Sequence, residues 1–111
     1  MATLPNHHRA EIDIAKLRDY CLSPTHLRGR HKARQFFAAL GITAADAQWL
    51  SAAIRDGISN AQTETDVSDQ FGQRWRVDLM LTRQNRRAVV RTVWLIPIGQ
   101  TVPRLITAWV L

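Results

Sequence analysis

The sequence predicts an α+β fold in which two to three N-terminal helices pack on a C-terminal four-stranded antiparallel sheet. Three observations support this prediction. Apolar residues recur with a helical period up to about residue 57 and with a strand period from about residue 62. The third is size, since 111 residues with a hydrophobic fraction of 46% fit one domain, residues 1–111, with its own core.

Three segments of the first half have helical spacing. Apolar residues recur at roughly helical intervals over 12–22, where Asp13 can cap a short first helix. Residues 30–40 carry an i, i+3, i+4, i+7 apolar stripe, and Gly41 follows them, as is typical after a helix end. A third helix is expected over 43–57, which begins with a threonine and ends at a glycine.

The second half is predicted to be strands joined by short turns. Residues 63–67 are polar and favour an edge strand, whereas 74–81 alternate between apolar and polar residues. Residues 88–96 are almost continuously apolar and β-branched, which indicates a central strand, and 105–111 form the last one. Short connections between consecutive strands predict an antiparallel meander.

Arg91 is the one charge within the expected central strand, so it needs an ion-pair partner or a cleft. Alternation places Leu105, Thr107 and Trp109 of the last strand on one face. If that face is also the face of Arg91, a guanidinium, a hydroxyl and an indole cluster on the sheet. The alternative is a structural ion pair to Asp78 or to a helix acid.

Charge points to a polyanionic partner. Fifteen Lys and Arg against nine Asp and Glu give a net charge of +6, and thirteen of the fifteen are arginines. Residues 1–42 carry +4, residues 43–72 carry −4 and residues 73–111 carry +6, which implies a polarised surface. Arginine pairs with phosphate bidentately and stacks on bases, so this bias suits a polyanion as the partner. An acidic protein is the alternative.

Other classes of protein lack their usual signals. Cys21 is the only cysteine, and a lone thiol fits a reducing compartment. We expect Cys21 to be buried as a small hydrophobic residue. No metal-ligand motif is present, and no Gly-rich phosphate loop, so we expect neither a metal site nor a cofactor. No apolar run approaches the roughly 20 residues of a membrane span, and no signal peptide begins the chain. The expected location is the cytoplasm.

The densest polar stretch is His26-Leu27-Arg28-Gly29-Arg30-His31-Lys32, at the predicted start of the second helix. Helix N-termini attract anions, and a glycine lets the backbone approach a ligand closely, so a phosphate site is one interpretation. The other interpretation is a solvated basic loop.

The chain also resembles a known family. The residues that carry the resemblance are, in order, Leu4-Pro5-Asn6, Ser23-Pro24-x-His26, Gly29-Arg30-x-Lys32-Ala33, Arg91-Thr92-Val93-Trp94 and Pro103-Arg104-Leu105-x-Thr107-Ala108. These residues resemble the motifs of a family of small bacterial proteins known as a domain of unknown function. Its members are encoded beside a small partner gene or lie at the ends of large polymorphic toxins. The layout is also similar to that of the barnase/EndoU/RelE-like ribonucleases.

This resemblance implies a toxin-like ribonuclease that is neutralised by a cognate antitoxin or immunity protein, which we expect to be acidic. The polar residues that match the family are His26, Lys32, Arg91, Thr92, Arg104 and Thr107. One position departs from it, because Trp109 stands where the family usually has a tyrosine. Trp109 cannot supply a hydroxyl, although it can stack on a base.

The mechanism expected from these residues is metal-independent attack of a ribose 2′-hydroxyl on the adjacent phosphate. His31 or His26 is the candidate acid or base, since histidine exchanges protons near neutral pH. Lys32 and Arg91 would hold the phosphate, and Thr107 would hydrogen-bond to it. The expected RNA contacts are Arg28, Arg30, Arg104 and Trp109. Alternatives are a non-catalytic RNA- or protein-binding module and an inactive family member.

Overall fold

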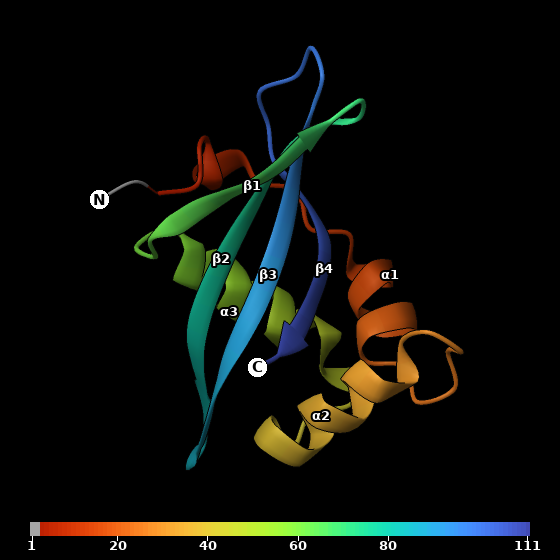
Figure 1. The fold of residues 1–111 in the computed structure, drawn as a ribbon. Helices are drawn as coiled ribbons and strands as arrows, with labels where there is room; N and C mark the ends of the chain where they lie inside the picture. Colours follow the sequence, from red (N-terminus) through yellow and green to blue (C-terminus); the bar gives the residue numbers. More distant parts are fainter. Residues whose placement is uncertain (1–2) are drawn as a thin grey trace.

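A strongly twisted antiparallel sheet forms the front of the molecule, and the helices lie behind it and beyond one of its edges (Figure 1). The computed structural model describes residues 3–111. Helix α3 crosses behind the sheet, whereas α1 and α2 lie beside strand β4 (Figure 1). The predicted α+β architecture is therefore confirmed.

The helices begin close to their predicted positions. They are α1 (Ile14–Lys16), a π-helical turn (Leu17–Cys21), α2 (Arg30–Leu40) and α3 (Ala47–Ile58), which a 3₁₀ turn precedes. Asp13 caps α1 as predicted, because its carboxylate accepts a hydrogen bond from the Ala15 N–H at 2.9 Å. Gly41 ends α2 in the left-handed conformation, with φ of 69°.

The short helix predicted over 12–22 is present, but it changes type along its length. The α-helical part is a single turn, and the chain then widens, so that the Leu22 N–H donates to the Leu17 carbonyl five residues back. Leu17, Cys21 and Leu22 are all buried. The extra residue per turn brings these three side chains to the core together, which a 3.6-residue period would not do.

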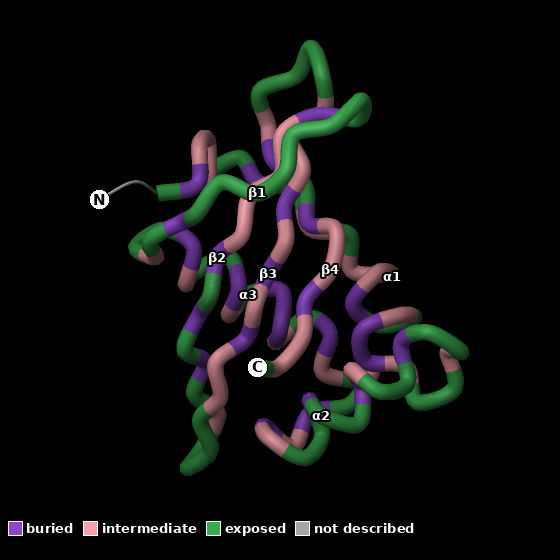
Figure 2. Tube along the Cα trace, viewed as in Figure 1, coloured by how far each residue is buried: buried purple, intermediate pink, exposed green. Residues whose placement is uncertain are grey.

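The sheet is the predicted meander, in the order β1 (Thr63–Asp69), β2 (Gly72–Arg83), β3 (Arg86–Pro97) and β4 (Arg104–Val110). Strand β1 is an exposed edge, as its green trace shows (Figure 2). The turn predicted over 83–87 is shorter than expected, because β2 and β3 extend until only two residues connect them.

The core lies between the sheet and the helices, with Trp94 as its largest fully buried side chain. Its indole N–H donates to the Thr92 hydroxyl at 2.8 Å, and this hydroxyl donates to the Val77 carbonyl at 2.7 Å. Thr92 is thus a fully buried link between the core and the ladder of β2 and β3.

A bulge in β4 changes one predicted face. Thr107 lies opposite Val93 and Leu105 lies opposite Trp94, so Ile106 is an extra residue in the strand. The bulge turns Leu105 into the core, where it is buried. The prediction that Leu105 shares a face with Thr107 and Trp109 was therefore wrong.

In the described part of the chain no individual helix has the length and apolar character needed to cross a membrane. Arg30–Leu40 and Ala44–Ile58 meet that requirement only when taken together as a pair bent by 75°.

Candidate functional site

The outer face of the sheet carries a row of polar and aromatic side chains at one level. The strand register places Asp78 opposite Arg91, and Arg91 opposite Trp109. Directly opposite residues share a face, so Arg91 and Trp109 lie side by side. The condition set in the sequence analysis, that Arg91 and Trp109 share one face of the sheet, is therefore met. Thr107 lies on the same face, opposite Val93. Beyond β4 the row continues into helix α2, where the Lys32 ammonium lies 5.2 Å from the Trp109 ring centroid.

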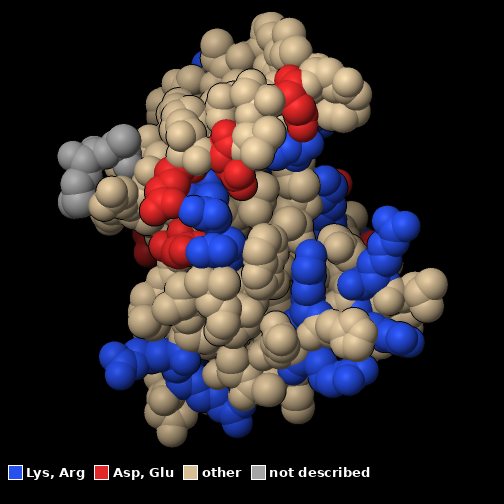
Figure 3. All heavy atoms as spheres, in the orientation of Figure 1, with Lys and Arg blue, Asp and Glu red and all other residues tan. Residues whose placement is uncertain are grey.

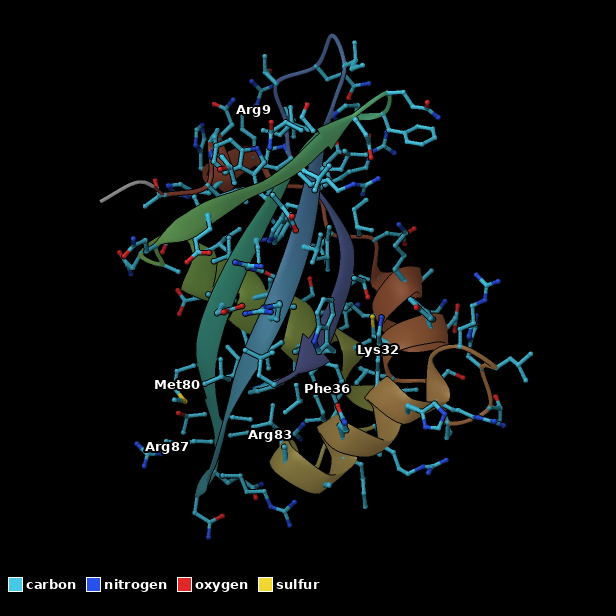
Figure 4. The ribbon with its side chains drawn as sticks, in the orientation of Figure 1. Arg9, Lys32, Phe36, Met80, Arg83 and Arg87 are labelled. Atoms are coloured by element: carbon cyan, nitrogen blue, oxygen red, sulfur yellow. The ribbon has the colours of Figure 1, made fainter. Side chains whose placement is uncertain are left out.

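Lys32 is held at the edge of β4 by neutral groups. Its ammonium donates to the Thr107 hydroxyl at 2.8 Å and to the Tyr20 hydroxyl at 3.1 Å. Figure 4 shows the Lys32 side chain between β4 and the α1 segment. It also lies 4.8 Å from the centroid of the Tyr20 ring. Within residues 3–111 no carboxylate forms an ion pair with Lys32. The ammonium has three donors and uses two, so one N–H and the whole charge remain for an anion.

The π-helical turn positions Tyr20 for this contact. The turn packs against β4, and the Cys21 thiol within it lies 3.9 Å from the Thr107 hydroxyl. Cys21 is buried, as predicted. π turns often occur at functional sites, where the wider turn redirects one side chain.

A shallow hollow of about 230 Å³ adjoins the Lys32 ammonium. His31, Lys32, Gln35 and Trp109 line it. It therefore combines a proton-transfer group, an unpaired cation, an amide and an aromatic face from two elements that are far apart in sequence.

Arg91 has a partner. Its Nε and Nη2 donate to the two carboxylate oxygens of Asp78 at 2.9 and 3.0 Å. These hydrogen bonds hold the pKa of the Asp78 carboxyl below its ordinary value. Arg91 therefore forms the structural ion pair with Asp78 and also belongs to the cluster with Trp109, so the two interpretations do not exclude each other. Its Nη1 group is not used in that pair.

His26 has a structural contact that the sequence did not reveal. Its Nδ1 accepts hydrogen bonds from the backbone N–H groups of Arg28 and Gly29, at 3.1 and 3.0 Å. Nδ1 must therefore be unprotonated in this arrangement, with the proton on Nε2. The imidazole also packs edge-on against Tyr20, with 4.8 Å between ring centroids. His26 thus supports the loop before α2 and does not line the hollow of His31.

Gly29, which we expected to let the backbone approach a ligand, makes a close approach to another part of the chain. A Cβ on Gly29 would lie 2.0 Å from the Tyr20 carbonyl oxygen, so the glycine allows the loop to pack on the π-helical turn. The site residues in this stretch also separate. Arg28 is exposed in the loop, and Arg30 lines a different hollow from that of His31 and Lys32.

Two further predicted residues lie apart from the hollow. Arg104 is exposed at the first position of β4, whereas Trp109 is near the end of that strand. Thr92 faces the core. Sequence reasoning missed Tyr20 and Gln35. The only signal for Tyr20 was that it is the single tyrosine of the chain.

A family model described as "Domain of unknown function (DUF6883)" matches residues 3–111, which include every helix and strand above. No curated protein and no solved structure gives a match.

Proposed function

We propose that this chain, which belongs to the DUF6883 family of unknown function, is a metal-independent endoribonuclease. In this proposal it acts in the cytoplasm as the toxin of a toxin–antitoxin or toxin–immunity pair, as the resemblance implies. One observation carries the enzymatic part. The Lys32 ammonium has no carboxylate partner in the described chain, and it shares a hollow with His31 and Trp109.

Each group has a role in cleavage. The free N–H of Lys32 binds a non-bridging phosphate oxygen, where negative charge grows in the transition state. Tyr20 and Thr107 fix the ammonium, so this charge needs little reorganisation during the reaction. Trp109 stacks on a base beside the scissile phosphate. Arg91, one strand away, supplies its unused Nη1 to the same or the next phosphate.

The bond changes follow from this placement. The ribose 2′-oxygen bonds to phosphorus as the bond from phosphorus to the 5′-oxygen breaks, which yields a 2′,3′-cyclic phosphate and a free 5′-hydroxyl. His31 accepts the 2′-hydroxyl proton. The 5′-oxygen takes a proton from the Tyr20 hydroxyl, whose oxygen accepts the hydrogen bond from Lys32.

The test is cleavage of a labelled RNA by wild type, Lys32→Met and His31→Ala. We expect Lys32→Met to lower the rate by roughly 10²–10³-fold, as for loss of one charged transition-state contact. Arg87→Ala is the matched control, because Arg87 is an exposed arginine of the β2–β3 hairpin outside the site. Products should end in a cyclic phosphate. Equal cleavage by wild type and Lys32→Met, with circular dichroism unchanged, would exclude this site.

A second candidate is a non-catalytic RNA- or protein-binding module, or an inactive family member. Two observations favour it: His31 is the only histidine that lines the hollow, and the fork of Arg91 is already held by Asp78. Wild-type protein that binds RNA but leaves every tested RNA intact would support this alternative.

A further inference from the structure

Three hollows follow one another around helix α2. The hollow of His31 and Trp109 shares His31 and Gln35 with a second one, of about 280 Å³, which Arg34 also lines. Arg34 in turn lines a third, of about 210 Å³. Three adjacent hollows therefore border the exposed side of α2, from the β4 edge to the opposite side of the helix.

The third hollow, which we call the α2 groove, is mainly apolar. Its lining includes Leu22, Pro24, Ala33, Phe37 and Ile42, from α2 and the segments on either side of it. The Phe37 side chain is 59% exposed, whereas phenylalanine side chains of monomeric proteins are usually more buried. An exposed aromatic beside a preformed apolar groove is typical of an interaction site.

The rim of the groove is basic and electrostatically unsatisfied. Arg30 and Arg34 line it, and neither forms an ion pair within residues 3–111. The sequence has no acidic residue between Asp19 and Asp46. In the sheet, by contrast, Arg74, Arg76, Arg83 and Arg91 all have carboxylate partners. Figure 3 shows blue side chains without red neighbours in the lower right part of the molecule, where α2 lies.

We propose that the α2 groove docks an acidic segment of a protein partner. One apolar side chain of the segment packs on the exposed Phe37 and Pro24, and flanking carboxylates pair with Arg30 and Arg34. An aliphatic floor suits a leucine or phenylalanine better than a nucleobase, which needs planar faces and polar edges. A segment that continues past Arg34 enters the second hollow and covers His31, because Arg34 lines both hollows and His31 lines the second. This interaction does not depend on ribonuclease activity.

The experiment is an unbiased selection of random peptides displayed on phage against the purified full chain. Enriched peptides are synthesised, and their affinities are measured for wild type, Phe37→Ser and Arg34→Glu. Phe71→Ser and Arg87→Glu are matched controls. Phe71 is also 59% exposed, but it lies in the β1–β2 turn, and Arg87 is exposed in the β2–β3 hairpin. Circular dichroism of each variant checks its folding.

We expect an enriched pattern of acidic residues around one large apolar residue. Affinity should fall about tenfold or more in Phe37→Ser and Arg34→Glu, and stay within about twofold of wild type in the controls. Neutral or basic consensus peptides, or equal binding to all variants, would overturn the proposal. So would oligouridine that binds with the same sensitivity to both substitutions, which would make the groove a nucleic-acid subsite. Concentration-dependent self-association that Phe37→Ser abolishes would assign it to a second copy instead.

Discussion

At the scale of single residues, two cations on either side of Trp109 are held in opposite ways. Lys32 is fixed by hydroxyl oxygens, so its charge is not compensated by the protein. Arg91 is fixed by a carboxylate, so its fork is rigid but its charge is largely cancelled. In the proposed site we therefore expect Lys32 to supply most of the attraction for a phosphate. Arg91 supplies mainly a rigid surface with one free amino group.

The ion pair of Arg91 gives stability a defined pH dependence. Hydrogen bonds from Arg91 lower the pKa of the Asp78 carboxyl in the folded protein. The ionised carboxylate therefore stabilises the fold at pH values above the ordinary carboxyl pKa. This stabilisation is lost as pH falls through the lower pKa of the folded protein. Because the pair is partly exposed, we expect Asp78→Asn to cost only about 0.5–1 kcal/mol at pH 7. The difference should be smaller at pH 3 than at pH 7, and it should vanish only once pH lies below the lowered pKa of the folded protein.

Urea denaturation of wild type and Asp78→Asn at both pH values measures this difference. Glu64→Gln is a useful comparison, since Glu64 is paired with Arg76 but is more exposed than Asp78. A loss in Asp78→Asn that is as large at pH 3 as at pH 7 would show that the ion pair is not its cause.

Two threonines on neighbouring strands should respond differently to the same substitution. Thr92→Val leaves the buried Trp94 indole N–H without an acceptor, which should cost about 1–3 kcal/mol of unfolding free energy. Thr107→Val removes a ligand of the Lys32 ammonium at a partly buried site, so it should weaken phosphate binding more than stability. Urea denaturation and RNA binding of both variants separate the two roles. Equal stability losses would contradict this division.

At the scale of elements, the packing of the loop before α2 on the π-helical turn sets the position of Tyr20. Gly29→Ala places a methyl group 2.0 Å from a backbone oxygen, and the backbone φ of −90° is otherwise open to alanine. We expect a loss of about 2–3 kcal/mol from this clash alone. Gly99→Ala is the contrast. It has a left-handed φ of 78° but nothing within 4 Å, so it should cost about 1 kcal/mol.

Thermal or urea unfolding of the two glycine variants checks this order. If Gly99→Ala were the more destabilised protein, the close contact between Gly29 and Tyr20 would not be the constraint described above.

Periodicity predicted most elements, but not the local irregularities that build the site. The strands and their order follow from alternation and short turns, and the register of Arg91 and Trp109 follows from them. The bulge at Ile106 adds a residue without a Gly or Pro to indicate it. The π-helical turn likewise depends on tertiary burial of Leu17, Cys21 and Leu22. Tyr20 could be assigned to Lys32 only once that turn was known.

At the scale of the whole molecule, binding of RNA should depend strongly on salt, since the net charge is +6. Arg28 and Arg30 have no ion pairs in the described chain, so each is free to contact a phosphate. Replacing both by alanine should reduce the slope of log affinity against log salt by about 1.4 on single-stranded RNA. Replacing Arg74 and Arg76 is the charge-matched control.

Fluorescence anisotropy over a salt series measures these slopes. Arg74 and Arg76 are paired with Asp69 and Glu64, so their loss should change the slope much less. The same change in slope for both pairs would mean that net charge, and not contact, governs binding.

The uneven pairing of charges also gives the molecule a permanent electric dipole. Strand β1 carries Glu64, Asp66 and Asp69. Red side chains run from the left side to the top of the face in Figure 3, whereas the acid-free α2 region lies at the lower right. In the field of a polyanion such a charge distribution experiences a torque before any contact forms. In the proposed function this torque favours approaches in which α2, with Lys32 and His31, faces the RNA, so that the fold orients the molecule before binding begins.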